Sequence, residues 1–306
     1  MTRYIVQRLL TLVPILFGVS LIVFGIMKLV PGDPALMAAG VEARQEDVER
    51  VRAYLGLDRP LHVQYARFVT NAVTGDFGIS ARTRRPVIDE VAERFPATVE
   101  LAIAGLLVSM AIGVTAGIVS ATMQYTFWDS LVMTLALLGV SVPVFWLGLM
   151  MMMLFSVQLG WLPTTGRGTW AQLVMPAFAL GFGSAAIVAR QTRSAMLEVL
   201  RQDYVQTARA KGLPENAVIL RHALKNAAIP SVTIIGLQFG GMLGGTVITE
   251  TVFAWPGMGR LIVEAIGFRD LQVVQAGILI LATIFVVTNL VVDLLYVYLD
   301  PRIKYG

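Results

Sequence analysis

Cysteine is absent from the 306 residues of the chain, and charged residues make up only 14% of them. The lack of cysteine excludes disulfide bonds, thiol chemistry and cysteine-ligated metal sites. A soluble domain carries charge at about a quarter of its positions, whereas 56% of this chain is hydrophobic. The composition therefore predicts an integral membrane protein.

Groups for catalysis and nucleotide binding are also scarce. The two histidines, His62 and His222, lie outside the long hydrophobic stretches, so neither is placed to act as a base within a membrane. The phosphate-binding pattern G-x-x-x-x-G-K-[ST] does not occur. Basic clusters with interleaved aromatic residues are missing as well, which argues against a nucleic-acid partner. We therefore expect no catalytic residue, no metal site and no cofactor bound by this chain.

Long hydrophobic stretches are plentiful, and six of them approach the ~20 residues that a helix needs to cross a bilayer. They predict an all-α membrane protein with six transmembrane helices and both termini on one side. The first stretch is long for the hydrophobic core of a signal peptide, so it is expected to be a retained anchor. The predicted spans are residues 9–30, 99–123, 131–157, 173–189, 228–248 and 273–299.

The orientation follows from basic residues, because short loops rich in lysine and arginine stay in the cytoplasm. An inside N-terminus places most of the basic residues of the short loops inside, and it places the long segment after the first span outside. The inside set is Arg3, Arg8, Arg190, Arg193, Arg201, Arg209, Lys211, Arg221, Lys225, Arg302 and Lys304; the short outer loops carry Arg167, Arg260 and Arg269.

The outer segment, residues 31–96, is expected to be ordered. PGDP at 31–34 is a turn signal, because proline fixes φ and Gly-Asp permits a bend. Residues 45–57 and 61–73 have apolar side chains at helical spacing, and the turn-rich residues 74–80 follow. Two roles stay open for this segment, a cap that shields the bundle and a docking surface for a partner.

Several residues in the spans are candidates for the translocation path or a gate. Pro143 removes one helical hydrogen bond and should bend the third span. Gly240 and Gly244 belong to a series of glycines four residues apart, a spacing that permits close helix contact in static packing or in a moving wall. Gln238 and Asp293 are polar at membrane depth, and for Asp293 a structural pairing and a gate role both stay open.

A polar stretch at residues 203–230 interrupts this hydrophobic pattern; its sequence is DYVQTARAKGLPENAVILRHALKNAAIP. Asp203 and Gln206 predict a capping box. A helix of about two turns should follow over residues 204–211 and end at Gly212, because glycine takes a left-handed backbone without steric cost.

A second helix is predicted to begin at Pro214 and Glu215, which suit a helical first turn, and to run towards Pro230. The two-turn helix before it is marginal in water by itself. We therefore expect a partner to dock on it, although composition alone is also compatible with an ordinary basic loop.

The spacing in this stretch resembles the coupling loop of ABC-importer permeases, in which Glu-Ala-Ala, three residues and Gly form a helix gripped by a cytosolic ATPase. Those places hold Gln206, Thr207, Ala208 and Gly212, so the Glu and the first Ala are substituted. TARAKGL and RHALKNAAIP here, with PGDP, GLDRPL, GDFG, FAWPGMGR and DPRIKYG elsewhere, are similar to the peptide and nickel branch of that family.

The resemblance implies the type I ABC importer permease fold, divided into an N-terminal transmembrane helix (1–30), a periplasmic loop with short helices (31–96) and a five-helix core (97–306). The core includes a cytosolic coupling loop at 190–228. The chain would form half of a translocation path in a bacterial inner membrane, with both termini cytoplasmic. The implied partners are a second related permease, two cytosolic ATPases that carry ATP and Mg, and an extracytoplasmic substrate-binding protein.

The resemblance also implies a substrate class and an ATPase contact. Dipeptides, oligopeptides or glutathione are the expected substrates, with nickel as an alternative; an ion-coupled carrier without an ATPase is the alternative of another class. Tyr204 and Ala208 are one turn apart and are predicted to share the ATPase-facing side. The expected coupling residues are Asp203, Tyr204, Val205, Ala208, Arg209, Lys211, Gly212 and Leu213.

Overall fold

The protein was analysed as a computed structural model that describes residues 2–29, 33–40 and 43–299. Within these residues the regular structure is helical, apart from an isolated antiparallel bridge between Ile79 and Pro86. This confirms the all-α prediction. The chain divides into two compact units, Met1–Thr98 with Pro256–Val286 (unit 1) and Val99–Trp255 with Val287–Gly306 (unit 2).

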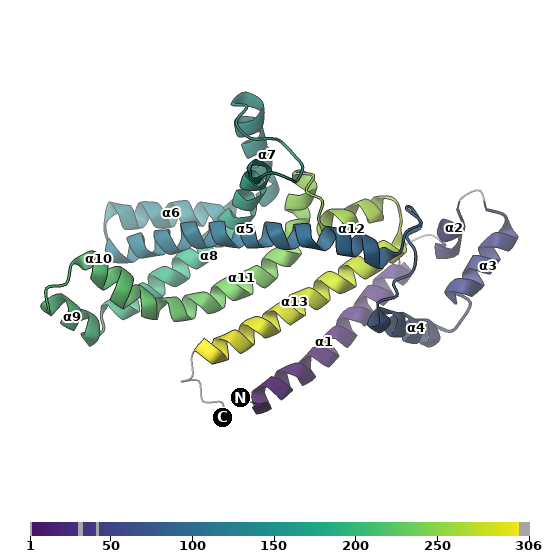
Figure 1. Ribbon diagram of the computed structural model, residues 1–306, viewed down its shortest axis with the longest axis horizontal. Helices are drawn as coiled ribbons and strands as arrows, with labels where there is room; N and C mark the ends of the chain where they lie inside the picture. The colour runs from purple at the N-terminus through teal and green to yellow at the C-terminus, as the bar shows by residue number, and fades with distance from the viewer. Residues whose placement is uncertain (1, 30–32, 41–42, 300–306) are drawn as a thin grey trace. The chain divides into compact units, whose positions relative to one another are not determined.

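Unit 1 contains the N-terminal helix, the outer segment and the helices that follow FAWPGMGR. Its helices, drawn from purple to blue and in yellow-green in Figure 1, are α1 (Thr2–Leu29), α2 (Pro34–Ala39), α3 (Gln45–Leu55), α4 (Leu61–Thr74), the start of α5 (Val87–Thr122), α12 (Met258–Gly267) and most of α13 (Leu271–Leu299).

The two predicted helices of the outer segment are present as α3 and α4. Both end at a glycine in the left-handed region, Gly56 with φ 66° and Gly75 with φ 78°, because a side chain there would be strained. Helix α4 lies against α1, where the Tyr65 hydroxyl is 2.8 Å from Ser20 Oγ. The predicted turn at 31–34 falls partly outside the described residues.

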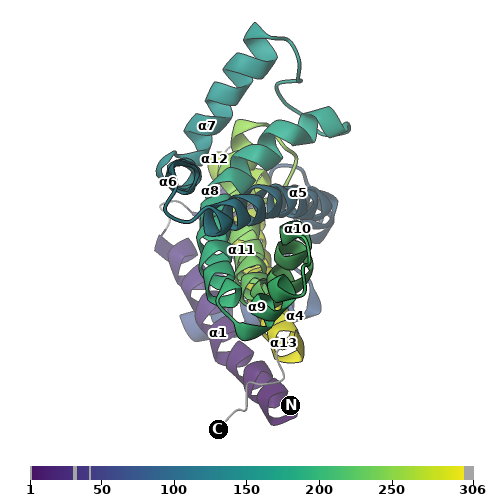
Figure 2. The ribbon, with the colours of Figure 1, turned by 90° about the vertical axis from the view of Figure 1, so that its left-hand side faces the viewer.

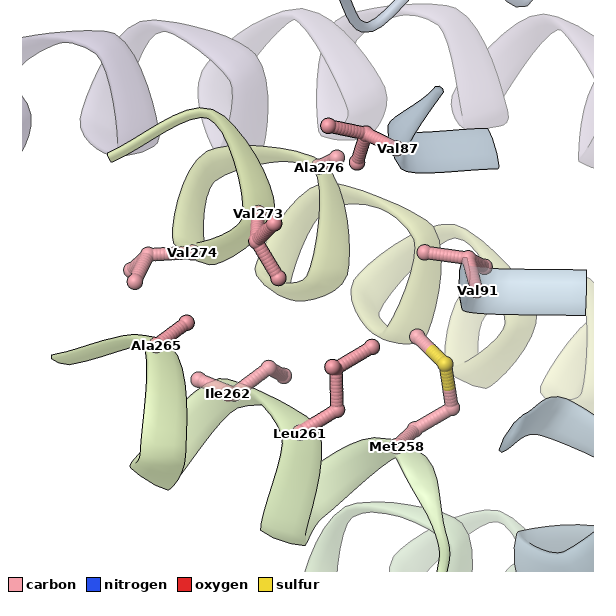
Figure 3. Close-up of a cluster of buried hydrophobic side chains, with 9 residues drawn as sticks. All are labelled: Val87, Val91, Met258, Leu261, Ile262, Ala265, Val273, Val274 and Ala276. Atoms are coloured by element: carbon pink, nitrogen blue, oxygen red, sulfur yellow. The ribbon is translucent and has the colours of Figure 1, made fainter. Parts of the chain in front are cut away.

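The core of unit 1 forms where α5, α12 and α13 meet (Figure 3). Apolar side chains from the first turns of α5 and α13 gather with those of α12, so burial from water holds the starts of α5 and α13 and helix α12 together. The buried set is Val87, Val91, Met258, Leu261, Ile262, Ala265, Val273, Val274 and Ala276.

A buried carboxylate ties the turn after α4 to this core. Asp270 is 2% exposed and caps α13, accepting from the Val273 N–H at 3.4 Å. It also accepts from the Ser80 hydroxyl at 2.6 Å and the Arg82 N–H at 3.2 Å. The predicted turn-rich residues 74–80 are therefore a fixed loop on the helical core.

Unit 2 carries the remaining helices, and α8 packs against both α6 and α11 (Figures 1 and 2). The elements are the end of α5, α6 (Phe127–Ser141), α7 (Val144–Met151), the π-helix η1 (Met152–Gln158), α8 (Trp170–Leu200), α9 (Asp203–Ala210), α10 (Glu215–Ala217), the π-helix η2 (Val218–Ala223), α11 (Leu224–Val252) and the end of α13.

Glycine permits the close contact between α5 and α8. A Cβ placed on Gly113 would lie 2.6 Å from the Val188 Cβ, and one placed on Gly117 would lie 2.6 Å from the Thr192 Cβ. Atoms do not approach so closely, so the two backbones pack at a distance that only glycine allows.

Four helices are long and apolar enough to cross a membrane, namely Gln7–Leu29, Val87–Thr122, Trp170–Leu200 and Leu271–Leu294. The pair Phe127–Ser141 and Val144–Gln158 adds a fifth if it is one span. The fifth predicted span, 228–248, lies within α11, which has 29 residues and is not among these helices in the part of the chain that is described. The predicted number of six is therefore not fully confirmed.

Two helices extend well beyond the predicted spans that they contain. Helix α5 begins at Val87, before the predicted residue 99, and α8 continues to Leu200, past the predicted residue 189. Ala195 and Met196 are buried beyond that predicted end, so apolar packing extends α8 through residues that read as a polar loop.

The predicted bend at Pro143 is confirmed and is a break in the helix. Helix α6 ends at Ser141, and Pro143 has extended backbone angles of −62° and 133° as the residue before α7. The two helical segments meet at 102°. Proline cannot donate the backbone hydrogen bond that would continue α6.

Candidate coupling site

The predicted two-turn helix is present as α9, Asp203–Ala210. It ends as predicted at Gly212, whose φ is 76°. The Gly212 N–H donates to the Arg209 carbonyl at 2.9 Å and the Leu213 N–H to the Ala208 carbonyl at 3.4 Å. This pair of bonds is a Schellman motif, which satisfies the last carbonyls of the helix and turns the chain sharply.

The predicted capping box is wrong. Gln202 precedes the helix, Asp203 is its first residue, and no side chain caps the first turn. Only two residues separate the end of α8 from Asp203, so the helix starts one residue earlier than the capping pattern suggested. The Asp203 carboxylate still stands at the positive end of the helix dipole.

The apolar side of α9 faces its own chain. Val205 is 0% exposed and Ala208 is 6% exposed, and both pack on Val218 of η2. The partly buried Val199 and Leu200 at the end of α8 complete this contact. A short helix needs its apolar stripe covered, and in this chain η2 and α8 cover Val205 and Ala208. A contact of these two residues with an ATPase stays a prediction.

The side chains that α9 leaves exposed lie on its opposite side and one flank. Tyr204 is 42% exposed, and its hydroxyl oxygen accepts from the Asn226 side-chain amide at 2.8 Å. The exposed set on and after the helix is Asp203, Tyr204, Gln206, Thr207, Ala210, Lys211, Gly212 and Leu213.

Arg209 is paired within its own chain. Its Nη2 donates to Glu215 Oε1 at 2.7 Å and its Nε lies 3.2 Å from Oε2, so the contact is bidentate. Hydrogen bonding to Arg209 holds the pKa of the Glu215 carboxyl below its usual range, and the same bond raises the pKa of Arg209. Glu215 of α10 thus supplies an acidic partner for Arg209.

A cavity of about 310 Å³ lies beside α9. The end of α5 and the turn after it, the end of α8, and α9, α10 and η2 all contribute to its lining. The lining residues are Ala121, Thr122, Gln124, Leu197, Leu200, Arg201, Arg209, Glu215 and Ile219.

An ion pair near this cavity has no counterpart in the sequence prediction. Arg193 of α8 donates from Nη2 to Asp129 Oδ2 at 2.9 Å and from Nε to Asp129 Oδ1 at 3.0 Å. Its Nε also lies 2.8 Å from Ser120 Oγ, and the Tyr125 N–H donates to Asp129 Oδ2 at 3.1 Å. The Ser120 hydroxyl donates to the same carboxylate.

This cluster was missed because Arg193 reads from the sequence as a loop residue on the cytoplasmic side. The apolar spacing that runs on through Ala195 and Met196 is the signal that would have extended α8 over it. Thr126 precedes α6 and its hydroxyl accepts from the Asp129 N–H at 3.4 Å, so the T-x-x-D pattern also marked the start of that helix.

The candidate path residues are Pro143 immediately before α7 and residues on α11 and α13, and their role stays a prediction. Gln238 and Asp293 are half-buried and Gly240 is buried. Gly244 is exposed, and a Cβ added there would meet nothing within 4 Å, so the close contact expected at this residue is not made with the described part of this chain. At Gly236 the expected contact exists, because a Cβ would lie 2.6 Å from Val292 Cγ1.

Comparison with known proteins assigns the chain to a family. Residues 1–102 match the N-terminal family of binding-protein-dependent transport system membrane components, and residues 113–305 match the binding-protein-dependent transport system inner membrane component. The chain is 48% identical over 305 residues to the glutathione transport system permease protein GsiC of Escherichia coli K12. It is 46% identical over 333 residues to the dipeptide transport system permease protein DppB of Alkalihalophilus pseudofirmus. Each comparison covers 100% of both chains.

Two solved structures share the fold. The MetNI methionine ABC transporter in inward-facing conformations matches 69% of this chain and 96% of the solved chain with a TM-score of 0.57 and 19% identity. An amino acid ABC transporter with histidines matches 70% and 94% with a TM-score of 0.51 and 16% identity. These matches confirm the ABC permease fold, and the chain is a multi-pass membrane subunit of a transporter complex, not an enzyme. It belongs to the family of inner membrane components of binding-protein-dependent transport systems.

Proposed function

We propose that this chain is the permease subunit of an ATP-driven importer of glutathione or dipeptides. The observation that carries the proposal is the full-length identity of 48% to glutathione permeases and 46% to a dipeptide permease. Family membership favours this function over an ion-coupled carrier that acts alone. The complex would also contain a second related permease, two cytosolic ATPases that bind ATP and Mg, and an extracytoplasmic substrate-binding protein.

The proposed ATPase contact is the exposed side of α9. Gln206, Thr207 and Ala210 lie opposite the buried stripe, and Tyr204 and Lys211 flank them. Burial of Val205 and Ala208 against η2 and α8 supports the proposal, because this packing fixes the short helix in place and leaves its other side free to bind a partner. Gly212 and Leu213 would then turn the chain into η2 and α11.

The proposed orientation places α9 and both termini in the cytoplasm and the segment with α2, α3 and α4 outside. The support is the distribution of basic residues over the short loops. Arg302 and Lys304 of that set lie outside the described residues.

A reconstituted complex tests the substrate. The chain would be purified with the permease, ATPases and binding protein encoded beside it and placed in proteoliposomes. We expect ATP-dependent uptake of labelled glutathione or a labelled dipeptide, with no uptake when the binding protein is omitted. Uptake of nickel but of neither peptide would overturn the substrate class, and uptake without any ATPase would overturn the proposed function itself.

A further inference from the structure

Helix α9 packs on η2 and on the end of α8. Val205 and Ala208 of α9 pack with Val218, Val199 and Leu200, of which the last two belong to the final turn of α8. A second apolar cluster joins the same end of α8 to η2 and to the end of α5, through Ala195, Met196, Ala223 and Ala121. A displacement of α9 is therefore delivered to this end of α8, because packed side chains are close to incompressible.

Among the described residues, the apolar cluster around Val205 and Ala208 of α9 includes none from the turn between α5 and α6. Thr122 and Gln124 line the 310 Å³ cavity together with Arg209 and Glu215. Leu197, Leu200 and Arg201 of α8 line the same cavity. The packed connection from α9 to α5 therefore runs through η2 and the end of α8, and α6 joins it by packing on α8.

The ion pair of Arg193 and Asp129 lies on this connection, about two helical turns before the end of α8. Through Asp129 it holds the first turn of α6, and through Ser120 it holds the last turns of α5. Gly117 meets Thr192 at the adjacent position with no room for a Cβ, so α5 and α8 are in close contact beside the pair.

The pair is mostly removed from water, since the side chains of Arg193 and Asp129 are 27% and 9% exposed. A buried ion pair is weak evidence for stability, because desolvation offsets most of its attraction, and a neutral pair of similar volume is often as stable. What the charged pair provides in addition is a fixed geometry, with a bidentate contact between guanidinium and carboxylate.

We propose that Asp129 and Arg193 are positioning residues for coupling: they lock the α5–α6 turn to α8, so that movement of α9 by the ATPase also moves α5 and α6. This inference rests on the proposed function. Without the ion pair, the ATPase would still bind α9 and hydrolyse ATP. The movement of α9 and α8 would then be passed on incompletely to α5 and α6, and import would fall.

The test compares Asp129→Asn, Arg193→Gln and the double variant Asp129→Asn/Arg193→Gln in the reconstituted complex. Each is assayed for ATPase copurification, ATP hydrolysis and substrate imported per ATP. Each single variant leaves one charge unpaired and can lower the yield of the complex, whereas the double variant leaves none. We expect the double variant to assemble and hydrolyse ATP, with import per ATP reduced about fivefold or more, the lower end of typical coupling effects.

Arg193→Lys is the matched control, because it keeps the charge without the bidentate geometry. Compared with Arg193→Gln, it should assemble as the wild type does and recover part of the import per ATP. Wild-type import per ATP in the double variant would overturn the proposal, since it would leave the pair a purely structural role. Equal losses of import and hydrolysis in that variant would overturn it in the same way. A wild-type complex that imports nothing in the presence of ATP would instead contradict the proposed function.

Discussion

At the residue scale, Gly212 is the clearest example of backbone geometry that determines a local structure. Its φ of 76° lies in the left-handed region, and a Cβ there would meet no atom within 4 Å. The space is therefore open, and only the backbone conformation opposes a side chain. A β-branched residue is expected to cost about 1–2 kcal/mol at such a position.

Gly212→Val should loosen the end of α9 and reduce ATP-driven import, while the chain still inserts because no span is altered. Gly212→Asn is the control, because asparagine tolerates the left-handed region better than other residues that carry a side chain. The measurement is uptake together with copurification of the ATPase. Equal uptake by the two variants would show that the sharp turn after α9 does not matter for transport.

The two glycines of α11 make a second residue-scale contrast. Gly236 has no room for a side chain against Val292, whereas Gly244 faces open space. Gly236→Leu should therefore lower the melting temperature of the purified chain, with overpacking that costs about 1–3 kcal/mol, and Gly244→Leu should not. If Gly244→Leu retains that stability but impairs import, the residue faces the path or a partner; a fall in stability equal to that of Gly236→Leu would contradict the contrast.

At the element scale, α9 shows which part of a site the sequence can predict. Its length and its end at Gly212 follow from local signals, the polar stretch and the glycine, and both are found. Its buried side could not be assigned, because Val205 and Ala208 are covered by η2 and α8, and nothing local says which neighbours lie there. Arg193 was assigned to a loop for the same reason, since packing of α8 extends the helix beyond its apolar span.

The two alanines of α9 give a matched test of its faces. Ala210→Trp adds bulk on the exposed side, so the chain should fold normally but lose ATPase copurification and import. Ala208→Trp adds the same bulk where the side chain is 6% exposed, and it should detach α9 from η2. Limited proteolysis of the loop around α9 separates the two, with faster cleavage expected only for Ala208→Trp. Retained ATPase binding by Ala210→Trp would show that the exposed face of α9 is not the docking surface.

At the scale of the whole molecule, the fold class and the ordered outer helices could be predicted from the sequence, because hydropathy and helical periodicity are strong over long segments. The number of spans was harder to predict. The break at Pro143 divides one predicted span into α6 and α7, and these segments meet at 102°, so composition alone does not settle whether this stretch is one span.

The absence of cysteine makes the orientation directly testable, because each introduced cysteine is the only thiol in the chain. Tyr54→Cys on α3 and Val73→Cys on α4 replace side chains that are 76% and 83% exposed. Leu220→Cys on η2, which is 58% exposed, and Lys211→Cys after α9 probe the other side. If the basic residues of the short loops set the orientation, an impermeant maleimide should label the first two sites in intact spheroplasts. The last two should react only after the membrane is opened, and the cysteine-free parent should not react in either state. Labelling of Lys211→Cys in intact spheroplasts would place α9 outside, beyond the reach of any cytosolic ATPase, and would contradict both the orientation and the proposed coupling contact.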